Sequence, residues 1–164
     1  MLQIKFHPDS DKEDVSQAVT EYQLIWNKEG LKFIEAIEKT SDLKFVESFI
    51  NAIVLEWPSN FRPLCFRASD NLETKKATLI HELCHRLISG NRINIKGKMD
   101  SLESHKDVDL ILYDIWIYLF GEEFAKRHVE LECQYRPFYK QAWDWTMTMT
   151  AEERKVKFKE LCSQ

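Results

Sequence analysis

Residues that break helices or close tight turns are scarce in this chain. Only four glycines and four prolines occur among its 164 residues, and no internal repeat or low-complexity segment is visible. A chain of this length is expected to form one domain, because domains usually contain about 100–200 residues. The shortage of turn-forming residues favours a helix-rich protein.

Paired cysteines and long apolar runs are also missing. The four cysteines show neither C-x-x-C spacing nor a zinc-finger pattern. No apolar run approaches the roughly 18–20 residues of a membrane span, and Asp114 interrupts the longest one. The segment 1–14 turns acidic within ten residues and has no apolar core of a signal peptide. We therefore expect a cytoplasmic protein with reduced thiols and no membrane contact.

The composition describes a globular chain that lacks a basic surface. The formal net charge is −4 and no block of lysine and arginine stands out, so we expect no nucleic-acid partner. Hydrophobic residues make up 44% and aromatic residues 12% of the chain, which argues against disorder. A chain of this size can bury a core without disulfides or a structural metal.

The spacing of apolar residues predicts several helices and two strands. Strands are expected at 45–57 and 61–69, where Pro63 favours an edge position or a late start for the second. A loop or small hairpin, the best candidate for a lid, is expected at 90–104. Helices are expected over 12–27, 31–40, 71–89, 105–120, 122–135 and 137–149, and after Thr150. This order predicts an α+β domain dominated by helix, with a small sheet and a central helix.

The helix expected over 71–89 carries the motif on which the functional interpretation depends. A D-x-x-E capping box at Asp70 predicts its start, and Gly90 predicts its end. Inside it, residues 81–85 read H-E-L-C-H, which fits H-E-x-x-H. Two histidines four residues apart lie on one face of a helix, so both imidazoles can reach one metal ion. The flanking residues are apolar, which argues against a merely solvated face.

Over about residues 45–120, the motif and the order of elements resemble the zincin metallopeptidases, which carry H-E-x-x-H on an active-site helix after a small sheet. The resemblance implies a Zn²⁺ ion bound by His81 and His85. It also implies that Glu82 acts as general base and acid, so that zinc-bound water hydrolyses a bond in a peptide or protein substrate. The whole chain, 1–164, is then one zincin-like metallopeptidase domain.

A catalytic zinc site needs a third protein ligand and an open position for water. The next predicted helix offers two candidates. Asp114 is the only charge in a very apolar stretch, and a buried carboxylate requires a partner, which can be a metal or a buried arginine, tyrosine or backbone group. His105 follows His85 by twenty residues and precedes Asp109 by four, which resembles the gluzincins, although they have glutamate at that position. We favour Asp114 and keep His105 as the alternative.

Two further features limit the interpretation. Ile88 and Asn91 occupy positions where the metzincin branch has glycine and histidine, so that branch is excluded. As an alternative function, the chain keeps the zincin fold as a binding or regulatory module with little or no hydrolytic activity. The oligomeric state is not predicted.

Other polar and reactive residues have simpler interpretations. Cys84 is expected to be a small core residue. A solvated helix face is expected for His128, Glu130 and Glu132. Four tyrosines are possible stabilisers of a developing oxyanion, and the sequence does not distinguish among them: Tyr113, Tyr118, Tyr135 and Tyr139.

Overall fold

The computed structural model describes residues 2–93 and 101–163, and within them six helices accompany a four-stranded sheet. The predicted helix-rich α+β fold is confirmed. The elements in chain order are β1 (Gln3–Pro8), α1 (Glu13–Ser41), β2 (Phe49–Leu55), β3 (Asn60–Phe61), β4 (Leu64–Arg67), α2 (Leu72–Gly90), α3 (Leu102–Phe120), α4 (Glu122–Glu132), α5 (Pro137–Thr146) and α6 (Ala151–Cys162).

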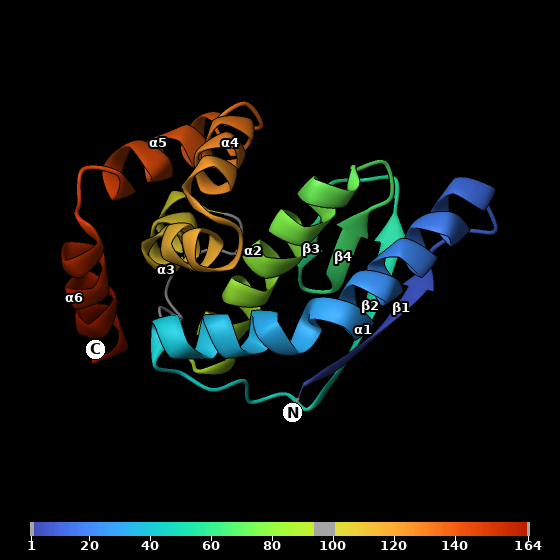
Figure 1. Ribbon diagram of the computed structural model, residues 1–164, viewed down its shortest axis with the longest axis horizontal. Helices are drawn as coiled ribbons and strands as arrows, with labels where there is room; N and C mark the ends of the chain where they lie inside the picture. Colours follow the sequence, from blue (N-terminus) through green and yellow to red (C-terminus); the bar gives the residue numbers. More distant parts are fainter. Residues whose placement is uncertain (1, 94–100, 164) are drawn as a thin grey trace.

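The sheet has the strand order β1-β2-β4-β3. Its first three strands are parallel, and the short β3 pairs antiparallel with β4 at the edge. Alternate residues are buried along β1 and β2, so the sheet turns one apolar face toward α1 and α2 (Figure 1). The strand expected over 61–69 is split, because Pro63 lies in the turn between β3 and β4.

The strand β1 was not predicted. Its signal is the alternation of buried Leu2, Ile4 and Phe6 with polar residues, a period of two that is typical of a half-buried strand. β1 and β2 are parallel and α1 connects them, so the chain begins with a βαβ unit. This unit supplies one wall of the core against which α2 packs.

Helix α1 is continuous where two helices were predicted. Gly30 lies in the gap between the two expected ranges, 12–27 and 31–40, yet it is buried within α1. A Cβ atom added at Gly30 would lie 2.7 Å from Cδ2 of Trp26, one turn earlier. The glycine therefore makes room for a buried indole ring and does not end the helix.

Helix α2 lies between the sheet and helices α3 to α6 (Figure 1). It spans nearly the predicted range, but the expected capping box is wrong. Asn71 is the N-cap, and its side chain accepts a hydrogen bond of 2.9 Å from the backbone N–H of Thr74. Asp70 stays outside the helix, whereas Glu73 pairs with Arg127 of α4 at 2.9 Å. α2 is thus anchored at its start to the helical half of the molecule.

Helix α3 contacts α1, α2, α4, α5 and α6, so it is the hub of the helical half. Ser101 caps it through a reciprocal capping box with Ser104, and Gly121, with φ of 89°, ends it. Of the loop expected over 90–104, residues 94–100 lie outside the described part of the chain. No helix in the described ranges combines the length and the apolar character needed to cross a lipid bilayer.

The glycine in α1 gives a test of packing against helix propensity. Gly30→Ala should lower the free energy of unfolding by about 1 kcal/mol, because the clash with Trp26 outweighs the roughly 1 kcal/mol by which alanine favours a helix. Urea unfolding measures the change. Gly90→Ala is the matched control: its Cβ meets Val46 at an ordinary 3.9 Å, so stability should be unchanged or higher. Equal stabilities of the two variants would contradict the packing argument.

Candidate metal centre

Helix α2 brings His81 and His85 together in the interior. The two residues stand one turn apart, and both side chains are buried. Their Nε2 atoms lie 3.1 Å apart, and their ring centroids 4.9 Å apart. The predicted placement of both histidines on one face of a buried helix is therefore confirmed.

His105, in the first turn of α3, completes a group of three imidazoles. Its ring centroid lies 4.8 Å from that of His85 and 5.4 Å from that of His81. Each of the three buried side chains offers one possible ligand atom, and these atoms all lie within 4.8 Å of one another. The described part of the chain therefore contains a compact three-histidine group that can hold a metal ion.

The second nitrogen of two of these rings is engaged away from the centre of the group. Nδ1 of His81 lies 2.6 Å from Oε1 of Glu132, and Nδ1 of His105 lies 2.9 Å from the carbonyl oxygen of Ser101. Both partners are acceptors, so each Nδ1 carries the proton and donates. This fixes the tautomer when the rings are neutral and leaves Nε2 with a lone pair, as metal-bound histidines require.

The close approach of the two Nε2 atoms on α2 needs a positive species between them. Two lone pairs 3.1 Å apart repel each other unless one nitrogen carries a proton or both bind a metal. Burial lowers the pKa of His81, but the charge of Glu132 and its hydrogen bond outweigh this and raise it to about 9. Burial, with the nearby His81 and His105, lowers the pKa of His85 well below its ordinary value. A proton therefore occupies this contact when no metal does.

Glu132, the last residue of α4, is the partner that orients His81. Its second oxygen, Oε2, accepts a 2.8 Å hydrogen bond from the indole Nε1 of Trp143 in α5. Burial raises the pKa of this carboxyl, but the charge and hydrogen bond of His81 and the Trp143 bond outweigh burial and lower it. Glu132 is thus held as a carboxylate at two points.

The expectation of a solvated face for His128, Glu130 and Glu132 is right only for Glu130, which is exposed. His128 is buried between the rings of Trp116 and Phe124. The signal that would have found this lies in the sequence itself. In α4 the buried positions are 124, 125 and 128, and Glu132 continues that stripe one turn further.

Asp109 adds a buried carboxyl group beside the histidines, one turn after His105 on α3. It is 1% exposed, and neither of its carboxylate oxygens has a hydrogen-bond partner in the described part of the chain. Burial and the charge of Glu132 raise its pKa well above the ordinary value, although His81 opposes this. A divalent cation among the imidazoles would supply the positive charge that this carboxyl lacks, so the residues fit a metal.

Asp114 does not belong to this group, and the preference for it as third ligand is corrected. Its carboxylate accepts two hydrogen bonds from Arg154 of α6, 2.6 Å from Nη2 and 3.0 Å from Nε. This bidentate ion pair satisfies the charge that stood out in an apolar helix. Nine residues separate Asp114 from His105, which places the two on opposite sides of α3. The alternative, His105, is the residue that joins the motif histidines.

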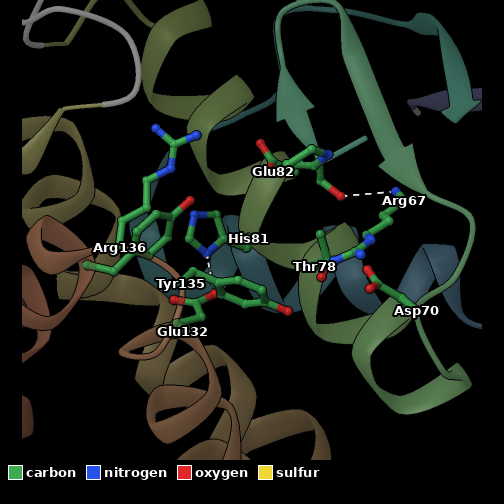
Figure 2. Close-up of a pocket in the computed structure, with 11 residues that line it drawn as sticks. Arg67, Asp70, Thr78, His81, Glu82, Glu132, Tyr135 and Arg136 are labelled. Atoms are coloured by element: carbon green, nitrogen blue, oxygen red, sulfur yellow. Dashed lines mark hydrogen bonds and ion pairs between the residues drawn. The ribbon is translucent and has the colours of Figure 1, made fainter. Parts of the chain in front are cut away.

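Glu82 and His81 line a pocket of about 190 Å³ next to the three imidazoles (Figure 2). Glu82 is buried on α2 beside His81. Of the four tyrosines considered, Tyr135 and Tyr139 line this pocket, and the Tyr139 ring centroid lies 4.2 Å from that of His105. Further walls of the pocket come from Arg67, Asp70, Thr78, Glu132 and Arg136.

Cys84, inside the motif, behaves as the expected core residue. Its side chain is fully buried among apolar neighbours. Burial, the largest effect, raises the pKa of its thiol well above the usual value, so the reactive thiolate form is suppressed. Cys84 therefore contributes packing at the back of the helix.

Comparison of the chain with protein-family models, with curated proteins and with solved structures finds no match. The functional interpretation therefore rests on the residues and their geometry.

Two substitutions on α3 should separate metal binding from stability. His105→Ala should reduce zinc affinity by more than about a hundredfold, because it removes one of three imidazoles. Asp114→Ala should keep the metal but lower the free energy of unfolding by about 3 kcal/mol, because it leaves the buried Arg154 guanidinium unpaired. Elemental analysis and urea unfolding measure the two effects. Metal loss in Asp114→Ala alone would contradict this assignment.

Metal binding at neutral pH should release about one proton per ion, because His81 is largely protonated below its pKa of about 9 and must be neutral to act as a ligand. Titration calorimetry in two buffers of different ionisation enthalpy gives the proton count. Glu132→Gln is the matched control: without the carboxylate charge the pKa of His81 falls, so fewer protons should be released. Proton-independent binding to the unchanged protein would contradict the assignment of a protonated His81 as a ligand.

Proposed function

We propose that the protein is a small zinc-dependent metallopeptidase in which His81, His85 and His105 hold the metal. The observation that carries this proposal is the convergence of three buried imidazoles, two of which have their Nδ1 atoms engaged by acceptors outside the group. Such outer hydrogen bonds are typical of metal-ligating histidines. Protonation of one imidazole does not by itself explain why three histidines lie together in the protein interior.

The chemistry of the donors supports zinc over harder ions. Three neutral imidazoles suit zinc, copper, iron and nickel, whereas magnesium and calcium prefer oxygen ligands. Three protein ligands with one open position are the arrangement of catalytic zinc, and structural zinc sites usually have four protein ligands. In the described ranges the group has three members and adjoins a pocket, which favours a catalytic site over a structural one.

Glu82 supplies the acid–base function in this proposal. When bound, zinc polarises a carbonyl group and makes water easier to deprotonate. The Glu82 carboxylate takes the proton from the attacking water and then donates it to the nitrogen of the departing amine. Glu82 suits this role because it lines the same pocket as His81 and is buried, so bulk water competes little for the proton.

Glu132, Trp143 and Tyr139 support this chemistry without carrying the proton. Glu132 keeps His81 turned so that Nε2 faces the metal position, and the Trp143 indole holds Glu132 in place. Tyr139 stacks close to His105 and lines the pocket, where its hydroxyl can donate a hydrogen bond to a developing oxyanion. The substrate is a peptide or protein, as the H-E-x-x-H resemblance implies.

Replacing the proposed base tests this function. Glu82→Gln should lower the rate of peptide hydrolysis by about 10²–10⁴-fold and leave the zinc content unchanged, because an amide cannot accept the proton of the attacking water. Mass spectrometry of cleaved denatured casein measures the activity, and elemental analysis the metal. Glu130→Gln, at an exposed position of α4, is the control and should retain full activity. Hydrolysis at an unchanged rate in Glu82→Gln would contradict the role of Glu82 as general base.

A further inference from the structure

The pocket extends from the histidines toward the N-terminal end of α2. Thr78, one turn before His81, lines it, and so do Asp70, just before the N-cap, and Arg67, the last residue of β4. Figure 2 shows Arg67 and Asp70 together on the side of the pocket away from His81 and Glu132. The pocket therefore has an imidazole end and a second end that carries one charge of each sign.

The Arg67 side chain is built into this second end. Two hydrogen bonds fix the backbone of Arg67. Its N–H donates to Oγ of Ser59 at 3.1 Å, and its carbonyl oxygen accepts from the hydroxyl of Tyr22 at 3.0 Å. The guanidinium Nε–H, by contrast, is buried and has no acceptor in the part of the chain that the structure describes. A buried donor without an acceptor requires an explanation, and for one that lines a pocket a bound polar group is the explanation that we pursue.

Asp70 is the complementary acceptor. Asn71 caps α2, so the Asp70 carboxylate is not needed there, and within residues 2–93 and 101–163 its side chain makes no hydrogen bond. Burial raises its pKa, while the nearby charges of Arg67 and Lys75 oppose the rise. Lys75 itself is paired with Glu21 at 2.5 Å. Asp70 thus faces Arg67 across a short space with its acceptor oxygens available.

We propose that Arg67 and Asp70 form a subsite for a substrate side chain that ends in a carboxamide, such as that of glutamine. A carboxamide has one acceptor oxygen and an NH₂ group with two donors, which match the Arg67 donor and the Asp70 acceptor. The opposite charges of the two residues balance, so an ionised side chain is attracted by one and repelled by the other. An aliphatic side chain would leave the Arg67 donor and the Asp70 acceptor without partners, so its binding would be much weaker.

The position of this subsite argues against the chain terminus of a residue beside the cleaved bond as its ligand. Asp70 precedes α2, and the nine steps from Leu72 to His81 span about 14 Å along the helix axis. An extended residue covers only about 3.5 Å, so the charged terminus of a residue that flanks the cleaved bond cannot reach Asp70. The volume of about 190 Å³ is also small for a ligand site, which suits one side chain. The assignment rests on the proposed peptidase function and deepens it.

Binding and cleavage should be measured separately. The probes are blocked peptides Ac-Ala₃-Xaa-Ala₃-NH₂ in which Xaa is glutamine, asparagine, glutamate, lysine or leucine. Calorimetry with the zinc-loaded, full-length Glu82→Gln protein gives their affinities without hydrolysis, and mass spectrometry with the unchanged protein gives their cleavage. We expect the glutamine peptide to bind at least about tenfold more tightly than the glutamate, lysine and leucine peptides.

Two variants in the Glu82→Gln background sharpen the test. Asp70→Asn should reverse the order of the glutamine and glutamate peptides, because it removes the repelling charge and leaves Arg67. Arg67→Gln should abolish the preference for glutamine over leucine. Arg62→Gln, an exposed arginine in the turn between β3 and β4, is the matched control and should change nothing.

The outcomes distinguish this subsite from the proposed function. Glutamine-selective binding without cleavage of any peptide would reject the peptidase and retain the subsite. Cleavage without selectivity at Xaa would reject the subsite and retain the peptidase. Equal binding of all five peptides, binding of none, or a preference for glutamate in the protein with Asp70 intact overturns the inference.

Discussion

The hydrogen bond between Nδ1 of His81 and Glu132 is the interaction on which the candidate centre depends. It joins α2, which packs on the sheet, to the end of α4 in the helical half of the molecule. It fixes the ring of His81, keeps the proton on Nδ1, which donates to the carboxylate, and directs Nε2 toward His85. The Trp143 bond to the other carboxylate oxygen extends the same constraint to α5, so three helices must pack correctly for one imidazole to face the group.

The density of buried charge is the second constraint. Glu82, Asp109 and Glu132 place three carboxyl groups close to His81 in a region shielded from water, and a protonated His81 offsets part of their charge. Buried carboxylates repel each other and lose hydration, which works against a compact core. A bound divalent cation would reverse this balance, since it binds the folded arrangement and not the unfolded chain. Metal affinity and the stability of the fold are then linked.

The sequence was sufficient to predict features that depend on neighbouring residues, such as which residues share a helix face. The apolar flanks of the motif were enough to place His81 and His85 on one face of a buried helix, and His105 was expected at the start of the next helix. That helix begins three residues earlier, at Leu102, and its cap, Ser101, was not predicted because residues 90–104 were expected to form a loop or hairpin. The sequence did not predict which side chains that are distant in sequence pair with each other in the fold. Asp114 was recognised as a buried charge, but its choice of Arg154 over a metal depends on how α6 docks, forty residues later. Glu132 was expected on a solvated face for the same reason, because its hydrogen-bond partner, His81, lies fifty-one residues earlier in the sequence.

The distribution of the centre along the chain has a consequence for biosynthesis. The motif helix is complete when the ribosome reaches Gly90, but the third imidazole comes from α3 and the supports of His81 come from α4 and α5. During synthesis from the N-terminus, the βαβ unit and α2 are available before the residues that close the site. A nascent chain that stops before Trp143 therefore carries all three histidines of the group but lacks the indole that holds Glu132, so His81 does not yet have its complete support.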